Sequence, residues 1–117
     1  MVVDDEPRMG KAMERLLAHR YRVTVVESAR EAIALLRSDP EFDGMVCDLM
    51  MPEMDGMELF QSLRESHPAL AGRMVFMTGG AYTDQARNFL ERIPHRRLDK
   101  PFRPEELERL IEASLGA

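Results

Sequence analysis

Five polar residues follow short apolar segments, and their side chains suit a site for a cation and a phosphoryl group. Asp4 and Asp5 follow "MVV", and Asp48 follows "MVC". Thr78 follows "RMVFM", and Lys100 follows "RRLD". Carboxylates bind metal ions, while a hydroxyl and an ammonium group bind phosphoryl oxygens. Because these residues lie far apart in the sequence, they can act together only if the fold gathers them.

The three aspartates need a positive partner if they lie together. Two carboxylates about 4 Å apart repel each other by about 4 kcal/mol at an effective dielectric constant of about 20. Oxygen ligands without His or Cys favour Mg²⁺, which keeps several waters and takes one or two carboxylates. With Mg²⁺ and the Lys100 ammonium group nearby, Asp48 can act as a nucleophile and form an aspartyl phosphate.

The segments before these residues have the patterns of short strands, and helical patterns separate them. Segment 21–26, "YRVTVV", alternates and is rich in β-branched residues, so it is predicted as a further strand. Ser28 with Glu31, and Asp55 with Glu58, have the spacing of helix-capping boxes. The predicted strands are 1–3, 21–26, 45–47, 73–77 and 96–99, the helices 7–17, 29–36, 56–63, 86–93 and 104–115, and the loops 39–44 and 67–72.

This alternation predicts an α/β fold with a parallel sheet and right-handed crossover connections. Parallel strands place all their carboxyl ends along one edge of the sheet, and ligands bind there where the strand order reverses. The fold would therefore gather the five polar residues at that edge. Segment 50–56, "MMPEMDG", would be the loop that leaves room above Asp48.

Length and composition limit the functional classes. With 117 residues, 44% hydrophobic and 32% charged, the chain is expected to be one soluble domain, residues 1–117. A net charge of -5 argues against direct binding of nucleic acid, and the apolar runs are too short to span a membrane. No secretion leader is recognisable, and the single Cys47 fits a reducing compartment, so the expected location is the cytoplasm.

Four motifs, taken in order, resemble the receiver domain of two-component response regulators. They are "VVDDE", "CDLMMPEMDG", "MTGG" and "DKPF", and they extend over nearly the whole chain. The spacing of 30 residues from Asp48 to Thr78, and of 22 from Thr78 to Lys100, also resembles that family. The resemblance implies a doubly wound (βα)5 flavodoxin-like fold. Its five-stranded parallel sheet would have the order 2-1-3-4-5, with helices on both faces.

The resemblance implies a role for each acid. Asp48 matches the phosphoacceptor, which takes its phosphoryl group from the phosphohistidine of a histidine kinase or a phosphotransfer protein. Asp5 matches a direct Mg²⁺ ligand, and Asp4 an acid that assists, often through water. Met50 stands where the family uses a backbone carbonyl as a metal ligand. The implied metal set is therefore Asp4, Asp5, Asp48 and the carbonyl of Met50.

The resemblance also implies how a signal would leave the site. Thr78 matches the hydroxyl that moves toward the phosphoryl group, and Lys100 matches the lysine that pairs with it, before a cis bond to Pro101. The surface formed by segments 86–93, 96–99 and 104–115 would change. Many relatives carry Tyr or Phe where Arg97 stands here, so the usual coupling to Thr78 is not expected, although Tyr82 can contribute.

Two alternative functions stay open. One is a receiver-like binding module that is never phosphorylated. The other is a Mg²⁺-dependent phosphohydrolase, which needs a base to position water. Met50 and Gly80, two residues beyond Asp48 and Thr78, cannot supply that base, so we expect a long-lived phospho-aspartate and no turnover enzyme. "FMTGGA" and "LDKPFR" resemble receivers of hybrid histidine kinases. In that family several residues usually precede the first strand, whereas here it begins at Met1, so we expect a longer parent chain.

Other residues that can do chemistry have simpler expected roles. Cys47 is expected to pack as a small apolar residue, and the methionines to fill the core, with Met50, Met51 and Met54 at the rim of the site. The histidines show no metal-binding spacing. One basic cluster is expected to be a solvated face or a partner contact: Arg92, His95, Arg96 and Arg97.

Overall fold

The computed structural model describes residues 1–39, 41–79, 83–93 and 96–116. Three residues with an expected role, Gly80, Tyr82 and His95, lie outside these ranges. The expectations attached to them are therefore left as predictions.

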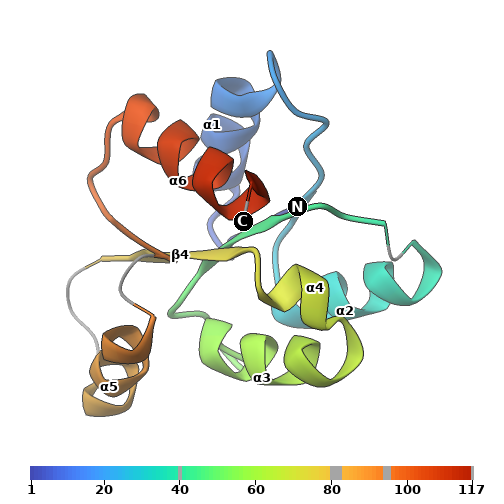
Figure 1. The fold of residues 1–117 in the computed structure, drawn as a ribbon, viewed down its shortest axis with the longest axis vertical. Helices are drawn as coiled ribbons and strands as arrows, with labels where there is room; N and C mark the ends of the chain where they lie inside the picture. The colour runs from blue at the N-terminus through green and yellow to red at the C-terminus, as the bar shows by residue number, and fades with distance from the viewer. Residues whose placement is uncertain (40, 80–82, 94–95, 117) are drawn as a thin grey trace.

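The strands form one parallel sheet in the predicted order, β2-β1-β3-β4-β5. Helices cover both faces of the sheet, with α1 and α6 on one side and α2, α3, α4 and α5 on the other (Figure 1). The doubly wound α/β fold is thus confirmed. The strands are β1 Val2–Val3, β2 Val25–Val26, β3 Met45–Asp48, β4 Met74–Thr78 and β5 Arg97–Asp99, and the helices are α1 Pro7–Leu17, α2 Ala29–Ser38, α3 Gly56–Ser66, α4 Pro68–Ala71, α5 Asp84–Arg92 and α6 Pro104–Gly116.

The predicted caps begin two of the helices. At α2, the Ser28 hydroxyl accepts a hydrogen bond from the Glu31 N–H at 3.1 Å. At α3, Asp55 and Glu58 form the full capping box, with reciprocal hydrogen bonds of 3.0 and 3.2 Å. These bonds satisfy backbone N–H groups that have no partner inside the helix.

Two predicted elements were wrong in extent. Segment 67–72 is not entirely loop, because Pro68 opens the short helix α4, where the Gly72 N–H donates to the Pro68 carbonyl at 3.0 Å. The second strand covers Val25–Val26 rather than 21–26. It is an edge strand that pairs with the two residues of β1, and the Thr24 carbonyl just before it accepts the Val2 N–H at 2.8 Å. Residues 21–23 lie before this contact and are not part of the strand.

Side chains of the central strands alternate between two cores. On β4, Met74 and Phe76 pack toward α2, α3, α4 and α5, while Val75 and Met77 pack toward α1 and α6. Burial on both faces explains why these strands read as continuous apolar runs. On the first face, Phe60, Phe76 and Phe89 meet edge to face with ring centroids 5.1 to 5.8 Å apart.

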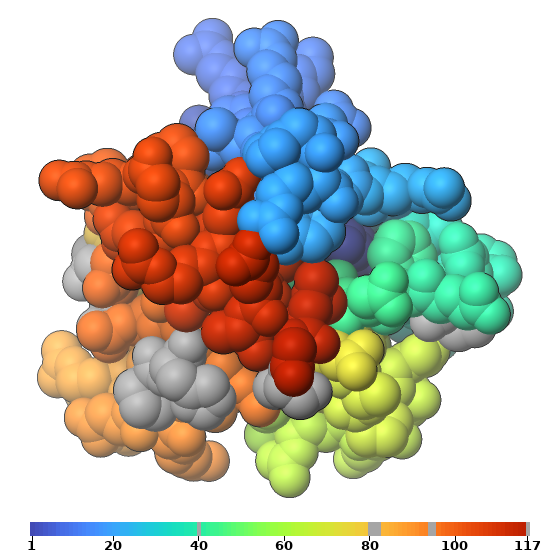
Figure 2. Space-filling model, turned by 45° about the horizontal axis from the view of Figure 1, so that its top comes forward, coloured from blue at the N-terminus to red at the C-terminus, as the bar shows by residue number. Residues whose placement is uncertain are grey.

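The second face is closed by α6, which lies against the end of α1 and the residues that follow it (Figure 2). Ion pairs join these segments at the surface. His19 lies 3.1 Å from Glu108, and Arg20 pairs with Glu112. Because these pairs are exposed, the burial of Met13, Leu17 and Leu107 contributes more to the packing of the two helices.

Candidate functional site

Three carboxylates converge at the carboxyl edge of the sheet, where β1 and β3 end side by side. Val3 is paired with Cys47, so the next residues, Asp4 and Asp48, come to the same point. One carboxylate oxygen each from Asp4, Asp5 and Asp48 lies within 4.8 Å of the other two. Asp4 is 1% exposed and Asp48 8%, whereas Asp5 faces solvent. The structure therefore brings together the acids that the sequence singled out.

Lys100 brings a positive charge to the same place. Its Nζ lies 3.9 Å from Asp4 Oδ2 and 3.7 Å from Asp48 Oδ2. The residue is placed by β5, since its N–H donates to the Thr78 carbonyl at 2.8 Å, and the bond to Pro101 is cis, as expected. The two ion-pair distances exceed hydrogen-bond length, so Lys100 acts on both carboxylates through its charge.

Burial makes the two inner carboxyl groups hard to ionise. Desolvation raises the pKa of Asp48 to about 6, partly opposed by the Lys100 charge and increased by Asp4. Desolvation likewise raises the pKa of Asp4. Asp4 Oδ1 accepts the Glu6 N–H at 2.9 Å, but the buried Asp4 Oδ2 has no hydrogen-bond partner. A buried anionic oxygen without a donor is costly, which is the condition that a bound cation relieves.

The donor set fits Mg²⁺. Its ligand atoms are all carboxylate oxygens, and one of the three acids is open to solvent, so bound waters have room. The backbone N–H of Met50 lowers the pKa of the Asp48 carboxyl group, while Met50 itself is 39% exposed. The role of the Met50 carbonyl as a ligand is still a prediction.

Thr78 has a partner that the sequence analysis missed. The residue is 1% exposed, and its hydroxyl donates to Asp99 Oδ1 at 2.8 Å. The same Asp99 oxygen lies 3.3 Å from Arg97 Nε. Thr78 and Asp99 are paired in the β4–β5 register and both end their strands. That shared position was the available signal, because strand-end residues in register on neighbouring parallel strands lie side by side.

The loop above Asp48 is held by a close backbone contact. The Gly56 N–H donates to the Leu49 carbonyl at 2.9 Å. A Cβ at Gly56 would lie 2.9 Å from the Asp48 carbonyl oxygen and 3.0 Å from Leu49 Cα, so only glycine fits. Glu53 has a positive φ of 66°, which turns the loop.

One expectation for this loop was wrong. Met51 does not line the rim, because it is 9% exposed and belongs to the core on the α3 face. Met54 is half-buried and packs against the same core, which leaves the exposed Met50 at the rim. Cys47 is fully buried and its thiol pKa is raised by desolvation, as expected of a packing residue.

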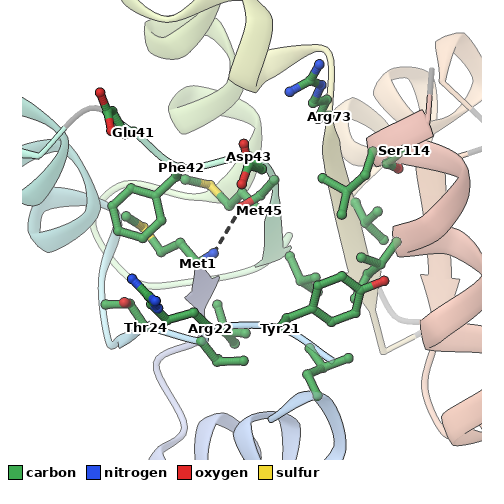
Figure 3. A pocket seen from close by; sticks show the side chains of 18 of the residues that line it. Met1, Tyr21, Arg22, Thr24, Glu41, Phe42, Asp43, Met45, Arg73 and Ser114 are labelled. Atoms are coloured by element: carbon green, nitrogen blue, oxygen red, sulfur yellow. Dashed lines mark hydrogen bonds between the residues drawn. The ribbon is translucent and has the colours of Figure 1, made fainter. Parts of the chain in front are cut away.

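A hollow of about 560 Å³ lies at the opposite, amino edge of the sheet. Figure 3 shows Met1, Tyr21, Phe42 and Arg73 around it, with the Met1 amino group donating to the Gly44 carbonyl at 3.0 Å. Its charged lining residues are of both signs: Arg22, Asp39, Glu41, Asp43 and Arg73. The acidic site and this hollow are therefore separate features at opposite ends of the strands.

The fold and the site together define a doubly wound α/β protein with a candidate divalent-cation site at the switch point of its sheet. The model of the response regulator receiver domain matches residues 1–112. The chain belongs to this family.

Curated proteins with similar sequences support the assignment to this family. The two-component response regulator ORR11 of Oryza sativa subsp. indica is 34% identical over 100 residues, which are 86% of this chain and 68% of that protein. The hydrogenase transcriptional regulatory protein HoxA of Cupriavidus necator is 40% identical over 84 residues, which are 72% of this chain but 16% of that protein. The matched region is thus a small part of some relatives and most of others.

Solved structures share the fold. A response regulator receiver domain protein from Clostridium thermocellum has a TM-score of 0.85 at 22% identity, covering 98% of this chain and 91% of that one. A CheY-like receiver domain protein from Methanospirillum hungatei has a TM-score of 0.83 at 23% identity, covering 98% of this chain and 90% of that one.

Among the described residues, none of the helices is long and apolar enough to cross a bilayer.

Proposed function

We propose that this chain is a phospho-accepting switch in which Asp48 takes a phosphoryl group from the phosphohistidine of a histidine kinase or a phosphotransfer protein. The observation that carries the proposal is the cluster of Asp4, Asp5 and Asp48 within 4.8 Å, faced by the Lys100 ammonium group. Membership of the receiver family supports it. The parent protein can be a hybrid kinase, whose own histidine would then be a donor.

In the proposed transfer, an Asp48 carboxylate oxygen attacks the phosphorus of phosphohistidine. A new O–P bond forms while the P–N bond breaks, and the imidazole nitrogen keeps the electron pair of that bond. Lys100 Nζ, 3.7 Å from Asp48 Oδ2, balances the negative charge that arrives with the phosphoryl group. The ammonium group also favours the ionised, nucleophilic form of Asp48 over the neutral acid.

Four groups would hold Mg²⁺: the side chains of Asp4, Asp5 and Asp48 and the carbonyl of Met50. When bound, the ion neutralises charge on the phosphoryl oxygens during transfer. The buried Asp4 Oδ2, which accepts no hydrogen bond, is the feature of this chain that most needs that charge.

The phospho-aspartate is proposed to be long-lived, which separates a switch from a phosphohydrolase. Hydrolysis needs a group that positions water. The exposed Met50 side chain, two residues beyond Asp48, has no basic atom. Gly80, two residues beyond Thr78, has no side chain to offer.

The proposed output surface is formed by α5, β5 and α6. A phosphoryl group adds about -1.5 to -2 charge units at Asp48. Thr78 ends β4 and Lys100 follows β5, so the two residues proposed to respond to the new charge belong to this side of the sheet. A partner protein that binds this surface would then distinguish the phosphorylated from the unphosphorylated form.

The proposal is tested by incubating the protein with acetyl phosphate and recording its intact mass. We expect the addition of one phosphoryl group that requires Mg²⁺ and is lost in Asp48→Asn. Asp43→Asn, which changes an exposed acid at the opposite edge of the sheet, is the matched control and is expected to be phosphorylated normally. Equal phosphate uptake by Asp48→Asn would contradict the proposal.

A binding module that is never phosphorylated is the second candidate. The engagement of the Thr78 hydroxyl by Asp99 favours it, since that hydroxyl is then not free to bind a phosphoryl oxygen. This candidate predicts a folded protein that gains no phosphate under the same conditions.

A further inference from the structure

The Thr78 hydroxyl is already in use at the site where it would meet a phosphoryl group. It donates to Asp99 Oδ1 at 2.8 Å, a normal length for a hydroxyl donating to a carboxylate oxygen. Thr78 is 1% exposed, so water cannot replace this bond freely. A buried hydroxyl gives up such an acceptor only if it gains another.

Asp99 connects this buried hydroxyl to the surface. Its side chain is 63% exposed, and its Oδ1 lies 3.3 Å from Nε of Arg97, which is 38% exposed. Leu98 between them is buried in the core on the α1 and α6 side. Since side chains alternate along a strand, Arg97 and Asp99 both point to the opposite side of the sheet, which places Arg97 beside Asp99.

The register of β4 and β5 fixes the arrangement. Thr78 is paired with Asp99, and Phe76 with Arg97. In addition, the Lys100 N–H donates to the Thr78 carbonyl at 2.8 Å. The backbone thus holds Asp99 next to Thr78 and holds Lys100 at the acidic site. Asp99 is the side chain between the buried hydroxyl and the Arg97 side chain.

We propose that Asp99 is a positioning residue that holds the Thr78 hydroxyl in the unphosphorylated state and thereby limits how readily Asp48 accepts a phosphoryl group. This inference rests on the proposed function. On phosphorylation, the Thr78 O–H exchanges its acceptor, from Asp99 Oδ1 to a phosphoryl oxygen. No covalent bond changes in this exchange, and Asp99 keeps Arg97 as its partner.

The direction of the effect follows from competition between two states. A contact made only in the unphosphorylated state lowers the apparent affinity for any ligand that needs the other state. Asp99→Ala removes that contact, so affinity for a phosphoryl mimic should rise by about fivefold, as expected for one hydrogen bond to a charged acceptor that solvent also reaches. Arg97→Gln should raise it less, by about twofold at most, because an exposed ion pair only helps to orient Asp99.

The test uses beryllofluoride, which binds a carboxylate as a mimic of the phosphoryl group, titrated calorimetrically at fixed Mg²⁺. The titration compares wild type with four variants: Asp99→Ala, Asp99→Asn, Thr78→Ala and the double variant Thr78→Ala with Asp99→Ala. Asp99→Asn keeps an oxygen acceptor and should stay close to wild type. In the Thr78→Ala background, Asp99→Ala should have no effect, which a merely structural role of Asp99 would not explain.

The outcomes separate this inference from the proposed function. If wild type binds beryllofluoride with Asp48 and Asp99→Ala binds with equal affinity, the role of Asp99 is refuted while the phosphoacceptor stands. The same gain in the Thr78→Ala background would also refute it. If neither wild type nor Asp99→Ala binds the mimic, the proposed function fails and this inference fails with it. A cooperative thermal unfolding transition of Asp99→Ala above the assay temperature excludes loss of the fold as the cause, even if its midpoint is lowered by the unpaired Thr78 hydroxyl.

Discussion

The two edges of the sheet hold charges in different ways. At the carboxyl edge, three carboxyl groups lie together, the two buried ones, Asp4 and Asp48, are paired with the ammonium group of Lys100, and Asp4 Oδ2 has no hydrogen-bond donor. At the amino edge, charges of both signs line the hollow of about 560 Å³, and the Met1 amino group is hydrogen-bonded to Gly44. The acidic edge has more negative than positive groups, whereas the charges around the hollow are nearly balanced. Chemistry is therefore expected at the edge where charge is uncompensated, not at the hollow.

The largest expected effect comes from removing the Lys100 charge. Lys100→Met leaves the carboxylates of Asp4 and Asp48 without their ammonium partner and removes the charge that would face the phosphoryl group, so the rate of phosphorylation by acetyl phosphate should fall about a hundredfold. Lys11→Met, an exposed lysine on α1, is the matched control and should leave the rate unchanged. A Lys100→Met rate within twofold of wild type would show that the charge balance at this edge has no catalytic meaning.

Removing an acid from the same edge should stabilise the protein. The pKa of Asp48 is about 6 in the folded state, above its usual 3.8. Between these two pH values, Asp48 is still protonated in the folded protein but has lost its proton in the unfolded chain. The contribution of this proton to the free energy of unfolding is fully present below about pH 4 and is lost as the pH rises through about 6. At pH 7 without divalent ions, the free energy of unfolding of Asp48→Asn should therefore exceed that of wild type by up to about 3 kcal/mol.

Urea unfolding at pH 4 and pH 7 in EDTA measures this gain. The gain should vanish at pH 4, and added Mg²⁺ should narrow it at pH 7, because the ion stabilises only the protein that keeps Asp48. A gain that is equal at both pH values would mean that repulsion and burial of the Asp48 charge are not its source.

The loop over the acidic edge offers a steric test. At Gly56, an added Cβ would meet the Asp48 carbonyl oxygen at 2.9 Å, and backbone cannot move aside as a side chain can. We expect Gly56→Ala to cost about 1–3 kcal/mol of unfolding free energy and to weaken Mg²⁺ binding. Gly72→Ala, where the nearest contact is an ordinary 3.5 Å, should be close to neutral. Equal stability of the two variants would contradict the close approach.

The smallest effect is expected at the amino edge. Arg73→Gln changes the charge of the hollow by one unit at a partly exposed position, so unfolding free energy should change by less than about 0.5 kcal/mol. Phosphorylation and Mg²⁺ affinity should not change. A tenfold loss of either would mean that the two edges are coupled through the strands and that the comparison between them fails.

Much of this arrangement could be predicted from the sequence because it depends on local signals. The caps at Ser28 and Asp55 follow from spacing, and the convergence of Asp4 and Asp48 follows from strands that all point the same way. The doubly wound order also agrees with the motifs that resemble the receiver family.

The errors came from interactions that depend on neighbours in space. Residues 21–23 have strand-like types, but they lie before the two-residue pairing of β2 with β1 and before the hydrogen bond from the Val2 N–H to the Thr24 carbonyl. The burial of Met51 and the Thr78 to Asp99 hydrogen bond depend on packing and register, which periodicity does not specify. At α4, by contrast, Pro68 is itself a helix-start signal in the sequence.

If Asp48 carries the phosphoryl group, chemical reduction should mark that residue. The protein is phosphorylated with acetyl phosphate and Mg²⁺, reduced with borohydride, digested and sequenced by mass spectrometry. Reduction of an acyl phosphate converts aspartate to homoserine, so we expect homoserine at position 48 and nowhere else. Homoserine at another aspartate, or phosphate that survives on a hydroxyl side chain, would contradict it.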